Sequence, residues 1–236
     1  MTDCRNGVAA QLRQEESRAV LTHCYGHALN LAVGDTLKKS KVCLDAMEVG
    51  FEISKLIRFS PKRNAAPERI KLESTEEDRV SGPSIRAFCP THWTVRANAI
   101  DGILSNYSDL NKLWEECLGA GKLDPDVKSR IIGVQSQMSS YNLLFGLHLC
   151  LGILRLTDNL SRTLQKPTLS AADGQSIASL TVKTLESMRS DEAFNLFFAR
   201  VEVDRKSTGT DEATLPRKRR APARFEVGTA WSRAPA

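Results

Sequence analysis

The sequence predicts a mainly α-helical protein, a helical bundle with one short strand-helix unit near its amino terminus. Apolar residues recur at helical spacing along most of the chain, and helix-ending residues, above all proline, fall between these stretches. The 236 residues are 41% hydrophobic and 26% charged, which is typical of a globular protein with a substantial core. Only one segment has the pattern of a strand.

The amino-terminal region combines this strand with two predicted helices. Residues 7–16 form a short polar helix, and Ala19 to Thr22 form the strand. A second helix spans residues 26–39, because apolar residues recur there at every fourth position: Leu29, Val33 and Leu37. A single strand makes no stable sheet by itself. Either it pairs with a segment outside this sequence, or these residues do not form a strand.

The middle of the chain is predicted to hold a buried helix, a loop and a long helix. Residues 42–59 are apolar on most sides, which indicates a buried helix that Pro61 ends. Residues 73–91 are polar and form the loop. A helix of about 27 residues then begins at Trp93, with Thr91 as its N-cap. Its core positions repeat every seven residues: Trp93, Ile100, Tyr107 and Trp114, together with Ile103, Leu110 and Cys117, and with Arg96 as the polar exception.

The remaining helices follow from capping signals and apolar stripes. Asp124-Pro125 begins a helix with an acidic cap and a proline in the first turn. The stripe from Tyr141 to Leu164 predicts the next helix, which Pro167 ends. A last helical stretch runs from about Ser170 to Val203, with a break near Ser190-Asp191.

Positive charge is concentrated at the carboxyl-terminal end. From Arg205 onward there are eight Lys or Arg and three Asp or Glu, so this tail carries the whole net charge of +5. The preceding chain is neutral and gives no electrostatic argument for nucleic acid. The tail lacks a helical period and is predicted to be unstructured from residue 205 onward. Its basic run can be a nuclear-import or phosphate-contacting segment, or a solvated linker: Arg217, Lys218, Arg219 and Arg220.

Neither secretion nor a membrane is indicated. No apolar run reaches the roughly 18 residues that a membrane helix needs, and the polar start of the chain is unlike a signal peptide. Six cysteines at irregular spacings suit reduced thiols better than a disulfide framework. We therefore expect a nuclear or cytoplasmic protein.

Cysteine and histidine are concentrated where the predicted strand meets the next helix. Cys24 and His27 form a C-x-x-H motif, which is half of a zinc site, and Cys89 and His92 repeat the spacing. The separation between the two pairs is far from that of a zinc finger. We therefore favour a structural motif, a packed thiol and a hydrogen-bonded imidazole, over a metal site, and expect no cofactor.

Trp93 opens the longest predicted helix, with His92 before it and Arg96 one turn later. An exposed indole beside a cation can stack on an unpaired base while the cation contacts phosphate. Alternatively, Trp93 is the first core residue of its seven-residue repeat, and periodicity alone favours this second interpretation.

Short motifs also follow one another along nearly the whole chain: Leu21-Thr-His-Cys-Tyr-Gly-His-Ala-Leu-Asn-Leu31, Cys89-Pro-Thr-His-Trp-Thr-Val-Arg96, Leu104-Ser-Asn-Tyr107, Thr157-Asp-Asn-Leu-Ser161, Met188-Arg189-Ser-Asp191 and Leu215-Pro-Arg-Lys-Arg-Arg-Ala-Pro222. Together they resemble the hAT superfamily of DNA transposases. Within it they are most similar to transposon-derived proteins labelled zinc finger MYM-type protein 1-like or 52 kDa repressor of the inhibitor of the protein kinase-like.

The resemblance implies a split fold, in which a helical insertion interrupts an RNase H-like catalytic domain. Residues 1–40 would be a remnant of that domain, residues 41–204 the insertion, and residues 205–236 a basic linker or tail. Catalysis in the family uses two Asp and one Glu that hold divalent metal. The resemblance implies that all three lie outside this chain, so we expect no enzymatic activity.

The resemblance also implies roles for individual residues. Cys24 and His27 correspond to the family's C-x-x-H, and Trp93 corresponds to a tryptophan that stabilises a flipped base. His92 stands where the family usually has Arg, which removes a permanent charge. We therefore expect a catalytically incomplete protein that at most binds nucleic acid, through Trp93, His92 and Arg96. The alternatives are a protein-interaction module built on the exposed bundle, and part of a longer, active transposase.

Overall fold

A computed structural model describes residues 7–18, 25–58, 60, 93–121 and 123–214. All regular secondary structure in these ranges is helical, which confirms the predicted mainly α-helical class. The predicted strand at Ala19 to Thr22 lies outside the described residues. The helices are α1 (Val8–Glu15), α2 (Tyr25–Lys39), α3 (Lys41–Arg58), α5 (Trp93–Ser105), α6 (Tyr107–Gly119), α7 (Pro125–Met138), α8 (Tyr141–Leu164), α9 (Ala171–Ser187) and α10 (Asp191–Thr208).

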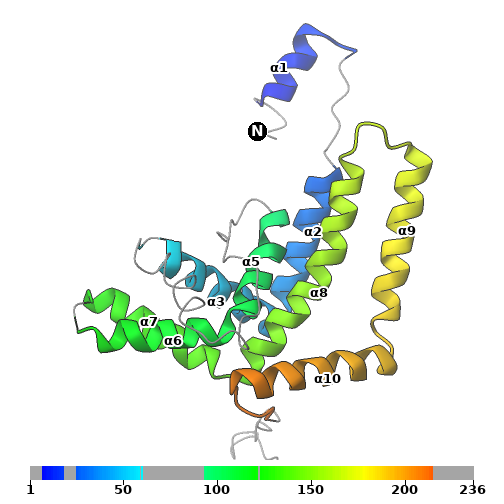
Figure 1. The fold of residues 1–236 in the computed structure, drawn as a ribbon. Coiled ribbons are helices and arrows are strands. Elements are labelled where there is room, and N and C mark those ends of the chain that lie inside the picture. Colours follow the sequence, from blue (N-terminus) through cyan, green and yellow to red (C-terminus); the bar gives the residue numbers. More distant parts are fainter. Residues whose placement is uncertain (1–6, 19–24, 59, 61–92, 122, 215–236) are drawn as a thin grey trace, which may run out of the picture.

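The longest helix, α8, is the centre of the bundle (Figure 1). Helices α2, α3 and α5 pack along it, α9 runs beside it, and α10 crosses near its start. Among the described helices, α8 alone is long and apolar enough to cross a membrane, but 61% of that stretch is buried inside the bundle. Because neighbouring helices cover so much of it, its apolar character belongs to the protein core.

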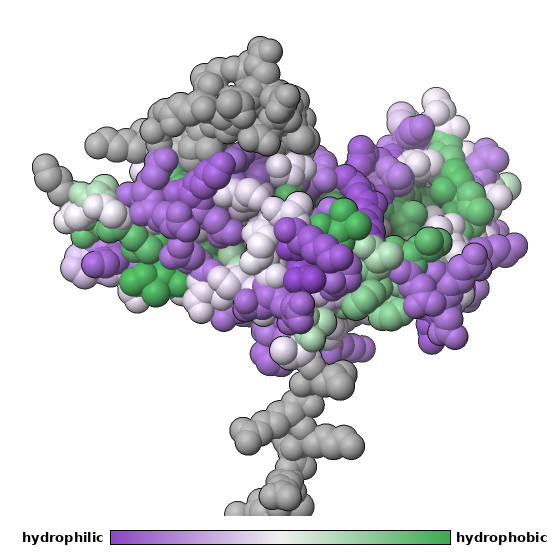
Figure 2. All heavy atoms as spheres, turned by 60° about the horizontal axis from the view of Figure 1, so that its bottom comes forward, coloured by the Kyte–Doolittle hydropathy of each residue, from purple (hydrophilic) through white to green (hydrophobic). Residues whose placement is uncertain are grey.

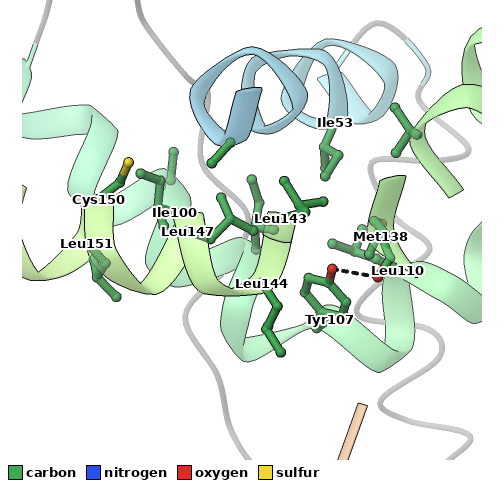
Figure 3. Packing of buried hydrophobic residues seen from close by; sticks show 14 of the residues in the cluster. Ile53, Ile100, Tyr107, Leu110, Met138, Leu143, Leu144, Leu147, Cys150 and Leu151 are labelled. Carbon is green, nitrogen blue, oxygen red and sulfur yellow. Dashed lines mark hydrogen bonds between the residues drawn. The ribbon is translucent and has the colours of Figure 1, made fainter. Parts of the chain in front are cut away.

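The core forms where α3, α5, α6, α7 and α8 meet (Figure 3). The hydroxyl group of Tyr107 donates a 2.8 Å hydrogen bond to the carbonyl oxygen of Met138, and burial raises the pKa of Tyr107. The indole N–H of Trp114 points to the sulfur of the same methionine at 3.2 Å. Both aromatic residues were predicted core positions, and their burial confirms that part of the seven-residue repeat.

The predicted single helix of about 27 residues is wrong, because α5 and α6 are separate helices. The interruption is Asn106, whose backbone leaves helical geometry at φ −119° and ψ 24°. Its side-chain amide donates a 2.6 Å hydrogen bond to the carbonyl oxygen of Gly102. Asparagine side chains that bond nearby backbone compete with the helical hydrogen bonds, which explains a bend at this position.

The break between α9 and α10 agrees with the prediction, but α10 ends later than predicted. Ser190 separates α9 from α10 and caps α10, since its hydroxyl oxygen accepts a hydrogen bond from the Ala193 N–H at 3.2 Å. However, α10 continues to Thr208 and ends at Gly209, which adopts a left-handed conformation with φ 68°. Thr210 beyond it is buried. The expectation of an unstructured tail from residue 205 is therefore wrong for these residues.

Candidate functional site

The described structure contains only some of the sequence-predicted site residues. His27 is exposed in the first turn of α2, while its partner Cys24 lies outside the described residues. Trp93 is the first residue of α5, and Arg96 follows one turn later, partly buried. His92 and the basic run at residues 217–220 also lie outside the described residues. Within the described part of the chain, no group of three His, Cys, Asp or Glu side chains could hold a metal ion.

A partly buried polar cluster joins the far end of α8 to the start of α2. The side-chain amide of Gln165 donates a 3.1 Å hydrogen bond to the hydroxyl of Ser161, which is fully buried. Gly26 lies against both, since a β-carbon there would come within 2.7 Å of the Gln165 amide nitrogen. This small residue, part of the C-x-x-H segment, therefore lets α2 approach α8 closely.

Asp158 lies one turn before Ser161 and is only 1% exposed. Burial raises the pKa of Asp158 to about 6, and the nearby charge of Arg162 opposes this shift. Its Oδ2 atom makes no hydrogen bond within the described structure. Near neutral pH this carboxyl group is therefore ionised only at a desolvation cost. Sequence reasoning missed it because the spacing of residues along α8 does not show which polar positions the neighbouring helices cover.

α10 packs against α8 through residues from Phe197 to Asp204. Val201 is fully buried, and the ring of Phe197 meets that of Phe145 edge to face at 5.2 Å. His148 Nε2 lies 3.1 Å from Asp204 Oδ2, without hydrogen-bond geometry. Burial lowers the pKa of His148, although Asp204 acts in the opposite direction. These contacts fix the orientation of the whole helix.

Large apolar side chains are exposed on α9, at its carboxyl-terminal end and along α10. Figure 2 brings α10 forward and shows apolar residues on the side of the molecule that carries these two helices. The exposed large apolar side chains of this region are Leu180 and Val182 on α9, Met188 directly after it, and Phe194, Leu196, Phe198 and Val203 on α10. The segment from Phe194 to Val203 has apolar residues on more than one helical face, and this signal could have been read from sequence.

An aromatic row connects this exposed end to the core. Phe194 contacts Phe198 with ring centroids 6.1 Å apart, Phe198 contacts Tyr141 at 6.3 Å, and Tyr141 contacts Phe145 at 5.9 Å. Tyr141 is buried, whereas Phe194 is 50% exposed. The row therefore presents a rigidly supported aromatic surface to solvent.

No protein-family model matches the chain, and no solved structure matches it.

Proposed function

We propose that this chain is a helical binding module of hAT-type transposase origin, without catalytic activity, which recognises another protein through the aromatic surface formed by Phe194 and Phe198. The observation that carries the proposal is the exposure of Phe194 at the end of a row of contacting rings. Soluble proteins seldom leave several large apolar side chains exposed side by side unless a partner covers them.

The physical setting of these two side chains favours binding. Phe198 is held against Tyr141, so little side-chain entropy is lost when a partner packs on it. Aromatic residues that fill a partner's pocket commonly contribute most of the binding free energy of an interface. The apolar side chains of α9 would extend the contact around this centre.

The test is affinity capture from cell extracts with the wild-type chain and Phe194→Asp. We expect Phe194→Asp to lose at least about 90% of a specific partner, since an interface hot spot contributes 2 kcal/mol or more. The matched control is Ile132→Asp on α7, because Ile132 is 49% exposed and Phe194 is 50% exposed. Capture of the same proteins in equal amounts by all three chains would contradict the proposal.

Nucleic-acid binding is the second candidate. It is favoured by the start of α5 at Trp93, since a helix amino terminus attracts phosphate and Arg96 lies on the next turn. The combined variant Trp93→Ala and Arg96→Ala should bind hairpin or single-stranded DNA at least about tenfold more weakly, because both stacking and charge are lost. Binding by the wild-type chain should also weaken with salt. Unchanged, salt-insensitive binding by the variant would rule this candidate out.

A further inference from the structure

The outer face of α10 carries a regular exposed stripe. Its members are spaced alternately by four and three residues, which places them on one side of a helix: Glu192, Leu196, Ala199, Val203 and Lys206. All five are exposed, and Leu196 and Val203 are 69% and 66% exposed. The buried Val201 points the opposite way, toward α8. The stripe therefore has no apolar partner within the described structure.

The stripe is complementary to the same stripe on a second copy of the helix that runs in the opposite direction. It begins with an acidic residue, ends with a basic residue, and has the small Ala199 in the middle. Against an antiparallel second copy, Glu192 would face Lys206 of the second copy and Leu196 would face Val203 of the second copy. The two alanines would meet at the two-fold axis, where small side chains let helices approach closely. A parallel arrangement would instead place like charges opposite each other.

We propose that two copies of this chain associate through α10, which pairs antiparallel with the α10 of the second copy along this stripe. Neither Glu192 nor Lys206 forms an ion pair within the described part of the chain, so both charges are available for the contact. The inference goes beyond the proposed function, because Phe194 and Phe198 lie on a different face of the same helix.

The expected affinity is modest. A helix of 18 residues is about 27 Å long, so two such helices form an interface below the standard size. We therefore expect a dissociation constant in the micromolar range, roughly 1 to 100 µM. The charged residues at the two ends of the stripe should determine the direction of pairing. Antiparallel pairing places opposite charges together, whereas parallel pairing places like charges together.

Sedimentation equilibrium of the full chain, from about 1 to 300 µM at low salt, tests the proposal across this affinity range. The wild-type chain should form dimers, whereas Glu192→Lys or Lys206→Glu alone should weaken association at least about tenfold. The double variant with both changes should return to within about threefold of wild type, because the charges are again opposite in an antiparallel pair. Val203→Glu should abolish the dimer.

Two controls separate this proposal from the proposed function. Phe194→Asp should leave dimerisation unchanged, and Val203→Glu should still capture the protein partner. All substituted stripe residues are exposed, and circular dichroism of each variant checks that it remains folded. A wild-type chain that stays monomeric at about 300 µM, or single charge variants that associate as wild type does, would overturn the proposal.

Discussion

At the scale of single residues, Asp158 is the most unusual group in the described core. A carboxyl group that is removed from water favours its neutral form, because the protein interior solvates charge poorly. Arg162 recovers only part of that loss, and the pKa of Asp158 is about 6. The raised pKa means that the folded state holds this proton more tightly than the unfolded chain does, so Asp158 stabilises the fold at acidic pH and destabilises it as the pH rises through about 6.

Replacing Asp158 with Asn should therefore increase the free energy of unfolding at pH 7.5, by about 2 kcal/mol. The gain should shrink steadily below about pH 6 and be lost only below about pH 3, where the carboxyl group is neutral in both the folded and the unfolded state. Chemical denaturation at several pH values measures both effects. The control is Asp211→Asn, an exposed change that should alter stability little at any pH. A loss of stability at pH 7.5 in Asp158→Asn would contradict this account.

At the scale of helices, α3 and α8 approach each other closely at Gly146. Gly146 lies on α8 against the first turn of α3, and a β-carbon there would come within 2.7 Å of the Val42 carbonyl oxygen and 2.9 Å of the Ala46 side chain. Because the nearest obstacle is backbone, no side-chain rotation can relieve the overlap. The two helices therefore depend on the absence of a side chain at this point.

Gly146→Ala should lower the free energy of unfolding by about 1 to 3 kcal/mol, since the two helices must move apart. Gly133→Ala is the matched control, because Gly133 is exposed in the middle of α7 and a β-carbon there meets nothing within 4 Å. It should raise the free energy of unfolding by about 0.5 to 1 kcal/mol through better helix propensity. Urea denaturation midpoints compare the two variants. Equal effects at both sites would show that packing at Gly146 is looser than described.

At the scale of the whole molecule, α8 organises the bundle and α10 directs two surfaces outward. Its aromatic surface is proposed to bind another protein, and its opposite stripe is proposed to bind a second copy. A dimer would then present two aromatic surfaces, and a partner with two binding sites would bind it more tightly than it binds a monomer. α10 therefore connects the two proposed interactions. Because each interaction uses a different face of this helix, each can be tested without disturbing the other.

Much of this fold could be predicted from sequence because its signals are local. The break before α10 was predicted from Ser190, and the core positions Tyr107 and Trp114 were predicted from their spacing. The separation of α5 from α6 could not be predicted, because the apolar repeat passes through Asn106 unchanged. The extension of α10 to Thr208 was missed for a similar reason, since its last turn is polar and has no apolar period.

The candidate site was less predictable than the fold. Apolar spacing shows that a helix has a buried face, but it does not show which apolar residues other helices will cover. Phe197 and Phe198 are neighbours in sequence, yet only the packing of α10 across α8 directs the first toward Phe145 and leaves the second partly exposed. Cys24 of the C-x-x-H motif lies outside the described residues, and the structure describes only the backbone of Trp93. The hypotheses about these two residues therefore stay predictions.

The sequence by itself determined the helical class and most helix boundaries, because propensity, capping and apolar period act within a few residues. Tertiary structure alone decided that α8 is the centre, that Asp158 is buried, and that α10 leaves Phe194 and the Leu196 to Val203 stripe uncovered. These outcomes depend on which helices meet in space. A local apolar pattern can show that a helix has a buried face, but it does not show which of its residues other helices cover.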